Sequence, residues 1–180
     1  MNPEFRPKKY VVGVIGPRAL PKKSAAYTFV ENLGKALINE GFSIVCGGRT
    51  GAMEAVCKGA CEAESYSFGC TIGILPGKEK SSANPYCDLV IPTGIGVARN
   101  LILVQTADIL VAIGGGSGTL SELAFSWQNG KHVICCTNFG GWSAELAGRS
   151  LDPHHQNLFH PASTIEEILS LLNHYLPTKK

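Results

Sequence analysis

Apolar runs that end in glycine-rich turns recur along this chain, and they limit the folds open to it. Gly16 follows the run 10–15, Gly47 and Gly48 follow the run 42–46, and a third turn, 114–119, follows the run 109–113. Each turn leads toward a stretch whose apolar residues recur at helical spacing. Short β-branched runs bounded by glycine are typical of strands buried on both faces of a parallel sheet. The sequence therefore predicts strands and helices in alternation.

The same reading extends over most of the chain. We expect helices from Ser24 to Gly41, through Ala52 to Ala60, from Gly94 to Thr106, from the 114–119 turn to near Gly130, and from a capping box at 163–166 to the end. We expect strands at 10–15, 42–46, 70–77, 89–92, 109–113 and 133–136. The segment 78–85 is expected to be an exposed loop, and a Gly/Asn/His-rich loop is expected after 136.

Alternating elements of this kind predict an α/β fold, specifically a single-domain, Rossmann-like, doubly wound parallel sheet with helices on both faces. The length of 180 residues suits one domain, and 44% hydrophobic residues suffice for its core. We expect residues 9–176 to form this domain, with tails at 1–8 and 177–180. Right-handed crossovers place every strand-to-helix turn at one edge of the sheet, where ligands of such folds bind.

Charge and hydropathy exclude several functions. The formal net charge is only +2 and no long Lys/Arg stripe occurs, so we expect no nucleic-acid partner. No apolar run approaches the roughly 18 residues of a membrane helix, and residues 1–9 contain no apolar signal segment. The seven cysteines form an odd set without CxxC pairs. They are expected to be free thiols, which indicates a reducing compartment and a cytoplasmic protein.

Metal binding is not expected from the sequence. Cys57 and Cys61 share a helix face and could in principle hold a metal, but free cysteines usually behave as small core residues. His154, His155 and His160 lie in the late loop without the spacing of a metal site, and we expect them to face solvent.

The turn 114–119 carries the strongest local indication of function. It holds four glycines together with Ser117 and Thr119, and it opens a helix. Glycine permits close approach to the backbone, and the free N–H groups and positive dipole end of a helix suit a phosphate. We therefore predict an anion site whose members are Gly115, Gly116, Ser117, Gly118 and Thr119.

Further binding residues are expected on the same edge of the sheet. Gly16 belongs to the first turn, and Gly47 and Gly48 belong to the second. For the second turn, 47–51, a packing turn with Arg49 in solvent is as good an interpretation as a phosphate site. An arginine such as Arg99 offers a fork to a phosphate or carboxylate. Glu122 could accept a hydrogen bond from a ribose hydroxyl or stabilise an oxocarbenium cation. The alternative for Arg99 and Glu122 is an ion pair on a helix surface, worth little.

Established nucleotide motifs do not match. Residues 73–79 lack Walker A spacing. The first turn lacks GxGxxG and no acid ends the second strand, which argues against NAD. Residues 115–119 nearly match the GxSxG elbow of serine hydrolases, but Thr119 replaces the last glycine.

The order of the motifs over residues 9–136 resembles the molybdenum cofactor carrier proteins and their bacterial relatives. These belong with Rossmann-like proteins often mislabelled lysine decarboxylases, which include the cytokinin-activating nucleoside monophosphate phosphoribohydrolases. The motifs that carry the resemblance are Gly47-Gly48-x2-Gly51-x-Met53-Glu54, Gly73-Ile74-Leu75-Pro76-Gly77, Ala83-Asn84-Pro85-Tyr86, Ile91-Pro92-Thr93-Gly94-x4-Arg99-Asn100, and Gly114-Gly115-Gly116-Ser117-Gly118-Thr119-Leu120-Ser121-Glu122.

The resemblance implies a carrier more than an enzyme. The phosphoribohydrolases have a proline where this chain has Gly114 and a lysine where it has Asn100, whereas Arg99 and Glu122 match their catalytic pair. The implied function is a homo-oligomeric carrier that holds molybdenum cofactor, a phosphorylated pterin, protects it from oxidation and passes it to molybdoenzymes. Its phosphate would lie on 115–119 and Arg99.

Two other functions remain open at this point. One is a phosphoribohydrolase that cleaves a nucleoside 5′-monophosphate, with Arg99 holding the substrate and Glu122 stabilising the transition state. The other is a regulatory sensor of nucleotides. Independently of the function, the stretch 94–106 is apolar nearly all round, and Phe125 lies off the core stripe Leu120, Leu123, Ala124 and Trp127. This surplus of apolar surface predicts a homodimer or homotetramer.

Overall fold

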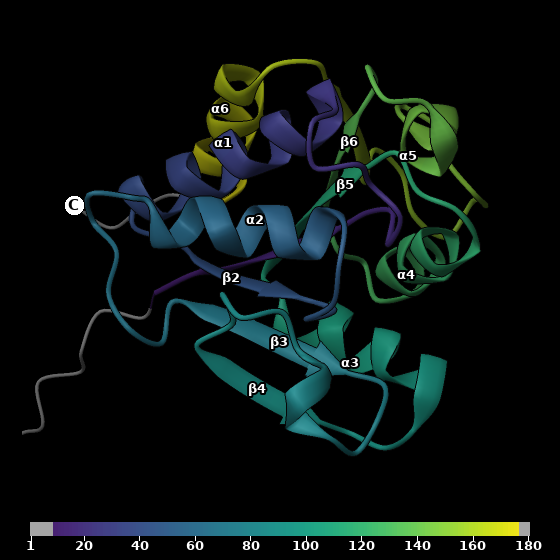
Figure 1. Cartoon of the computed structure of the whole chain (residues 1–180). Coiled ribbons are helices and arrows are strands. Elements are labelled where there is room, and N and C mark those ends of the chain that lie inside the picture. Colours follow the sequence, from purple (N-terminus) through teal and green to yellow (C-terminus); the bar gives the residue numbers. More distant parts are fainter. Residues whose placement is uncertain (1–8, 177–180) are drawn as a thin grey trace, which may run out of the picture.

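The computed structural model describes residues 9–176 (Figure 1), so the two expected tails lie outside the described residues. The strands are β1 (Val11–Ile15), β2 (Ser43–Cys46), β3 (Thr71–Leu75), β4 (Leu89–Pro92), β5 (Ile109–Ile113), β6 (Val133–Cys136) and β7 (Phe159–Ala162). The α-helices are α1 (Ala25–Asn39), α2 (Ala52–Cys61), α3 (Arg99–Thr106), α4 (Ser117–Gln128), α5 (Gly141–Leu146) and α6 (Ile165–Tyr175), and two 3₁₀ turns are η1 (Lys80–Ser82) and η2 (Gly96–Ala98).

All seven strands form one parallel sheet in the order β4-β3-β2-β1-β5-β6-β7. Helices α1, α2 and α6 pack on one face, and α3, α4 and α5 pack on the other (Figure 1). This arrangement confirms the predicted doubly wound α/β fold. Because the strand order reverses between β1 and β5, the turns that follow these two strands diverge there and leave room for a ligand.

The central strands explain why the sheet is stable. Every residue of β2, β5 and β6 is buried, since helices cover both faces there. The edge strand β4 instead exposes Leu89 and Ile91. At the start of α1, the Ser24 hydroxyl accepts a hydrogen bond from the Tyr27 N–H, as its predicted role of N-cap requires.

Four details of the predicted elements are wrong. The stretch after 136 is not only a loop, because it contains α5 and β7. α5 has only six residues, too few to show helical periodicity, and β7 contains Pro161, which an edge strand tolerates because it needs no further N–H donor. The stretch predicted as one helix from Gly94 begins with the 3₁₀ turn η2, and α3 proper starts only at Arg99.

The capping box of α6 lies one residue later than predicted, at Thr164 and Glu167. The expected core stripe of α4 also differs in part. Leu123 and Trp127 are buried as predicted, but Leu120 and Ala124 are only half-buried, and Glu122 and Ser126 are buried instead. The reason is that α4 packs against α3 as well as against the sheet.

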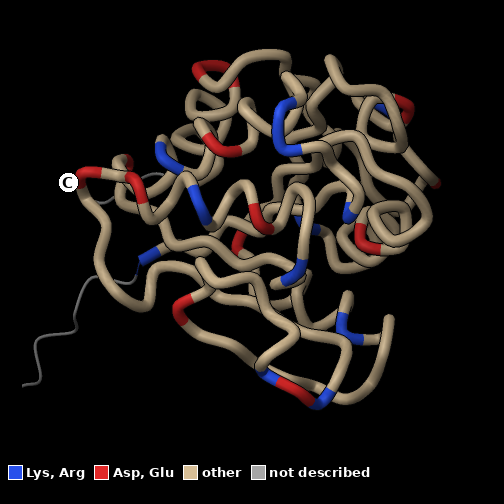
Figure 2. Tube along the Cα trace, viewed as in Figure 1, with Lys and Arg blue, Asp and Glu red and all other residues tan. Residues whose placement is uncertain are grey.

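Charged residues of both signs are scattered over the described chain (Figure 2), in keeping with the small net charge. Within residues 9–176, no helix combines the length and the apolar character that crossing a membrane requires.

Candidate functional site

A cavity of about 500 Å³ opens at the carboxyl ends of β1 and β5. Its volume lies within the range of small-molecule binding sites. The lining residues come from the end of β1, from the turns after β1, β2, β3 and β5, and from η2, α2, α3 and α4. They are Val14, Ile15, Gly16, Pro17, Arg18, Ala19, Gly47, Arg49, Met53, Pro76, Val97, Arg99, Asn100, Gly116, Ser117, Gly118, Thr119 and Glu122.

The N-terminus of α4 faces this cavity. The first hydrogen bond of the helix runs from the Leu120 N–H to the Gly116 carbonyl at 2.9 Å. Among the described residues, none accepts a hydrogen bond from the N–H groups of Ser117, Gly118 or Thr119, and Gly116 supplies no side-chain cap. Three backbone donors and the positive end of the helix dipole are therefore free to bind an anion.

The glycines of this turn have two different roles. Gly115 has a φ of +94°, and a Cβ there would lie 2.3 Å from Thr119 Oγ1, so the turn itself requires glycine. Gly116 and Gly118 have ordinary φ values, and a Cβ at either position would meet no atom within 4 Å. Packing within the chain therefore does not explain these two glycines, whereas a ligand lying against the backbone does.

The first residue of α3, Arg99, reaches across the cavity to α4. Its Nη1 lies 3.6 Å from Glu122 Oε1, and the two side chains are 13% and 7% exposed. Arg99 Nε and Nη1 are buried and have no hydrogen-bond partner among the described residues. A Cβ on Gly47 would lie 2.6 Å from Nη1, so that glycine makes room for the guanidinium. The arginine thus retains donors for an anionic ligand.

The carboxyl group of Glu122 is buried beneath the cavity. Burial raises its pKa to about 7, although the positive charge of Arg99 works in the opposite direction. Glu122 is also the one carboxylate that lines the cavity within the described residues. Near neutral pH it is present in both charged and neutral forms, so it can accept or donate a hydrogen bond.

Asn100, next to Arg99, connects α3 with the start of α4 through hydrogen bonds. Its Nδ2 donates to Ser121 Oγ at 2.7 Å and to the Gly118 carbonyl at 3.4 Å. The residue is almost fully buried. It therefore ties the start of α3 to the start of α4 and holds Arg99 near the free N–H groups.

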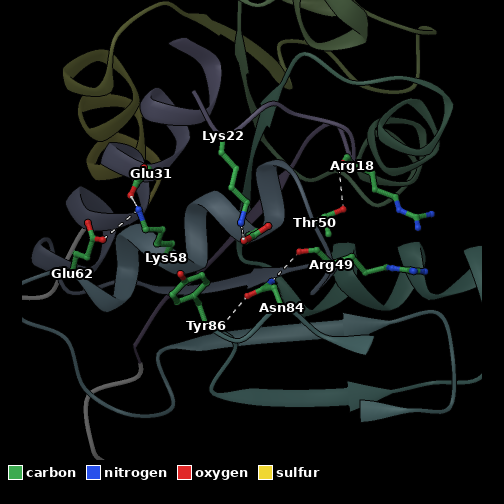
Figure 3. Close-up of polar contacts among 10 residues, drawn as sticks. Arg18, Lys22, Glu31, Arg49, Thr50, Lys58, Glu62, Asn84 and Tyr86 are labelled. Carbon is green, nitrogen blue, oxygen red and sulfur yellow. Dashed lines mark hydrogen bonds and ion pairs between the residues drawn. The ribbon is translucent and has the colours of Figure 1, made fainter. Parts of the chain in front are cut away.

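Two further arginines, Arg18 and Arg49, line the cavity. The sequence pattern drew attention to Arg49 but not to Arg18. Arg18 follows the Gly16-Pro17 turn, and its carbonyl accepts a hydrogen bond from Thr50 Oγ1 at 3.1 Å. The Arg49 carbonyl accepts one from Asn84 Nδ2 at 3.0 Å. In Figure 3 both arginine side chains extend in the same direction from these anchored backbones. Arg18 follows the Gly16-Pro17 turn at the carboxyl end of β1, and this position could have predicted that it lines the cavity.

Most of the predicted site residues meet at the cavity. Gly16, Gly47, Arg99, the segment 116–119 and Glu122 all line it. Gly48 and Gly115 belong to the adjoining turns but are not among the lining residues. Gly16 is also needed for packing, because a Cβ there would lie 2.9 Å from the Ala52 Cβ and 3.0 Å from the Ile113 carbonyl oxygen.

The histidines lie away from the cavity and from Ser117. No histidine lines the cavity in the described part of the chain, so Ser117 has no imidazole base there. His160 pairs with His132 across 2.8 Å, and His155 contacts the edge of Trp127, so these two are partly buried and not in solvent as predicted. His154 is exposed, as expected.

Comparison with known proteins agrees with the resemblance seen in the motifs. The molybdenum cofactor binding protein from Rippkaea orientalis superposes with a TM-score of 0.78 at 35% identity, covering 93% of this chain and 97% of that one. The molybdenum cofactor carrier protein from Chlamydomonas reinhardtii gives a TM-score of 0.78 at 31% identity, covering 94% and 99%.

A more distant relative is an enzyme. The cytokinin riboside 5′-monophosphate phosphoribohydrolase of Mycobacterium tuberculosis is 29% identical over 115 residues, which are 62% of this chain and 59% of that protein. The matched part is thus less than two thirds of the enzyme. The SLOG cluster4 family matches residues 9–169, nearly the whole described domain, and this chain therefore belongs to the SLOG cluster4 family.

Proposed function

We propose that this protein is a non-catalytic carrier or storage protein for molybdenum cofactor. The cofactor is its cargo, and its terminal phosphate binds the N-terminus of α4 together with Arg99. Gly115 and Gly48 shape the turns that border the site, and Gly16 and Gly47 line it.

One observation carries this proposal: two elements that line the same cavity have hydrogen-bond donors without partners among the described residues. The N–H groups of Ser117, Gly118 and Thr119 have no partner among the described residues, and neither do Arg99 Nε and Nη1. The open positions at Gly116 and Gly118 let a phosphate reach these donors. Apolar lining residues such as Met53 and Val97 offer surface to a flat pterin ring.

The composition of the site favours a carrier over an enzyme. In the described chain, the cavity lining contains one carboxylate and no histidine or cysteine, which leaves Glu122 as the single acid-base group. Asn100, at the position where the phosphoribohydrolases have a lysine, donates its Nδ2 to Ser121 and Gly118, and its Oδ1 has no partner among the described residues. Such a site suits an anion, and within residues 9–176 Glu122 is its single group for proton transfer.

Protection of the cofactor tests this proposal. Cofactor released anaerobically from a molybdoenzyme is mixed with the purified protein and then exposed to air, and its ability to reconstitute a cofactor-free nitrate reductase is followed in time. We expect a longer active lifetime with the protein than with an equal amount of serum albumin. Equal decay in the two samples would refute the carrier function.

The alternative function is the phosphoribohydrolase, and the Arg99–Glu122 pair supports it. Arg99 would hold the 5′-phosphate, and Glu122, when ionised, would stabilise an oxocarbenium-like transition state. Incubation with AMP and with isopentenyl-adenine monophosphate decides between the two functions. Release of free base that disappears in Glu122→Gln favours the enzyme, and absence of base above background excludes it for these substrates.

The proposal includes a homo-oligomer and molybdoenzymes as acceptors. Exposed apolar side chains support the first part, because β4 and the segment after it expose Leu89, Ile91, Ile95, Val97 and Ile102. Apolar groups clustered on an edge strand and its neighbouring helix are typical of an interface. A dimer or a dimer of dimers would cover them.

A further inference from the structure

Three cysteine thiols from separate elements meet beside the sheet, outside the cavity lining. Cys46 ends β2, Cys57 lies in α2, and Cys87 precedes β4. The Cys46 and Cys57 sulfurs are 3.6 Å apart, the Cys57 and Cys87 sulfurs are 3.7 Å apart, and all three lie within 4.8 Å of one another. None of the three is in a disulfide.

These spacings match those of ligands around one metal ion. Sulfurs bound to a common metal at about 2.3 Å lie roughly 3.8 Å apart in a tetrahedral site and roughly 4.0 Å apart in a planar trigonal one. Two of the three separations already fall close to these values. The third separation, between Cys46 and Cys87, is at most 4.8 Å, which is within about 1 Å of the trigonal value.

The surrounding chain holds Cys87 in place. Its segment is fastened to the end of β2 by Asn84, whose N–H donates to the Gly48 carbonyl at 2.8 Å and whose Nδ2 donates to the Arg49 carbonyl (Figure 3). Asn84 Oδ1 also accepts a hydrogen bond from the Tyr86 N–H at 3.1 Å. The thiol of Cys87 then lies over Gly73, where a Cβ would be only 2.9 Å from its sulfur.

The environment also suits a thiolate. The Gly48 N–H donates to Cys46 Sγ at 3.4 Å, which stabilises negative charge on that sulfur. Cys46 and Cys57 are fully buried, whereas Cys87 is only partly buried and leaves a path for an ion from solvent. Cys61, one turn after Cys57 on α2, is not part of the cluster, because its sulfur lies 3.7 Å from the Tyr86 carbonyl instead. Cys57 therefore lies with Cys46 and Cys87, and not with Cys61, the partner on the same helix face that the sequence offered.

We propose that Cys46, Cys57 and Cys87 bind one Cu(I) ion in a three-coordinate site. Among the described residues, this group of candidate ligands contains three sulfurs and no histidine or carboxylate as a fourth ligand. Structural zinc sites use four ligands, whereas soft thiolates in a three-coordinate set suit Cu(I). Binding is not a redox step: copper stays Cu(I), and the thiol protons that it displaces pass to the solvent. This site is independent of the proposed carrier function.

A competition titration tests the proposal. Fully reduced protein, kept without oxygen, is titrated with Cu(I) against the chromophoric chelator bathocuproine disulfonate. We expect one Cu(I) per chain and three sulfur neighbours by X-ray absorption at the copper edge. Cys87→Ser should weaken Cu(I) binding by roughly 100-fold or more, since loss of a ligand exceeds the 10–100-fold effect of losing a ligand's outer partner.

Two controls make the outcome decisive. Cys61→Ser changes a thiol on the same helix but outside the cluster, so it should bind Cu(I) like the wild type. Thermal unfolding identifies any variant that fails to fold, and the partly exposed position of Cys87 makes its serine variant the mildest of the three. The proposal is overturned if the wild type does not compete with the chelator, if Cys87→Ser binds as tightly as Cys61→Ser, or if Zn²⁺ binds in preference to Cu(I).

Discussion

The guanidinium of Arg99 and the carboxyl group of Glu122 lie 3.6 Å apart, at a distance too long for a hydrogen bond and short enough for an ion pair. Arg99 begins α3 and Glu122 lies in α4, so the pair links the two helices whose N-termini border the cavity. Because Arg99 Nε and Nη1 remain without partners, the pair leaves donors unused at the site. These unused donors are the basis for proposing a ligand contact at Arg99.

The buried carboxyl of Glu122 makes stability depend on pH. Its pKa is raised from 4.5 to about 7, so the folded protein holds this proton more tightly than the unfolded chain does. Stability therefore falls as pH rises from about 4.5 to about 7, by on the order of 3 kcal/mol, and the loss is complete above that range. Glu122→Gln should lack this decline.

Urea unfolding of the wild type and of Glu122→Gln across this pH range measures the effect. The difference between the two proteins cancels the contribution of the other titrating groups. A wild-type curve parallel to that of the variant would mean that the pKa of Glu122 is not raised.

Replacement of Arg99 tests its role toward the anion. Arg99→Ala should weaken the binding of a phosphorylated ligand by about 1.5–3 kcal/mol, the range for hydrogen bonds to charged groups. Added salt should weaken the wild type more than the variant. Arg149→Ala removes an exposed arginine that is not among the cavity residues and serves as the control. If salt affects Arg99→Ala and the wild type equally, Arg99 is structural.

Replacement of Gly116 tests the close approach to the backbone. Gly116 has φ −105°, outside the left-handed region that favours glycine, and its Cβ would meet no atom within 4 Å. Gly116→Val should therefore fold with a melting temperature close to that of the wild type and yet lose ligand binding.

A matched control is Gly77→Val, since Gly77 is equally open and exposed but does not line the cavity. Calorimetric titration compares the three proteins. Unchanged affinity in a folded Gly116→Val protein would move the anion site to another turn, with 47–51 as the next choice.

The exposed apolar residues after β4 test the assembly. The stretch 94–106 buries Leu103 and Val104, but it leaves Ile95, Val97 and Ile102 exposed, Val97 by 83%. We expect sedimentation equilibrium at micromolar concentration to give a dimer or tetramer of the 19.1 kDa chain. Ile95→Glu combined with Ile102→Glu, two exposed residues that do not line the cavity, should shift the mass toward the monomer. A wild-type monomer would refute the oligomer.

The local pattern of the sequence was sufficient for the fold and for most of the cavity. Periodic runs predicted six of the seven strands, and because parallel strands end at one edge, Arg99 and Glu122 could be expected to meet there. Two elements were missed: α5 has only six residues, and the strand β7 contains His160 and Pro161, which interrupt the apolar run that marks the other strands.

What remained hidden depends on contacts between distant parts of the chain. Cys46 and Cys57 are 11 residues apart, but Cys87 follows Cys57 by 30 residues, and no spacing rule connects Cys87 with the other two. The burial of Glu122 beside Arg99 likewise follows from how α3 packs on α4, which periodicity alone does not specify.

Stoichiometric transfer of the cofactor tests the central claim most directly. Molybdenum cofactor is released anaerobically from a molybdoenzyme, mixed with the wild type, Gly116→Val or Gly77→Val, and separated by gel filtration, and the protein fractions are analysed for molybdenum and pterin. The carrier function predicts molybdenum and pterin in equal amounts with the wild type and with Gly77→Val, and neither with Gly116→Val. Cofactor that elutes entirely apart from the wild type, or equally with all three proteins, would contradict the account.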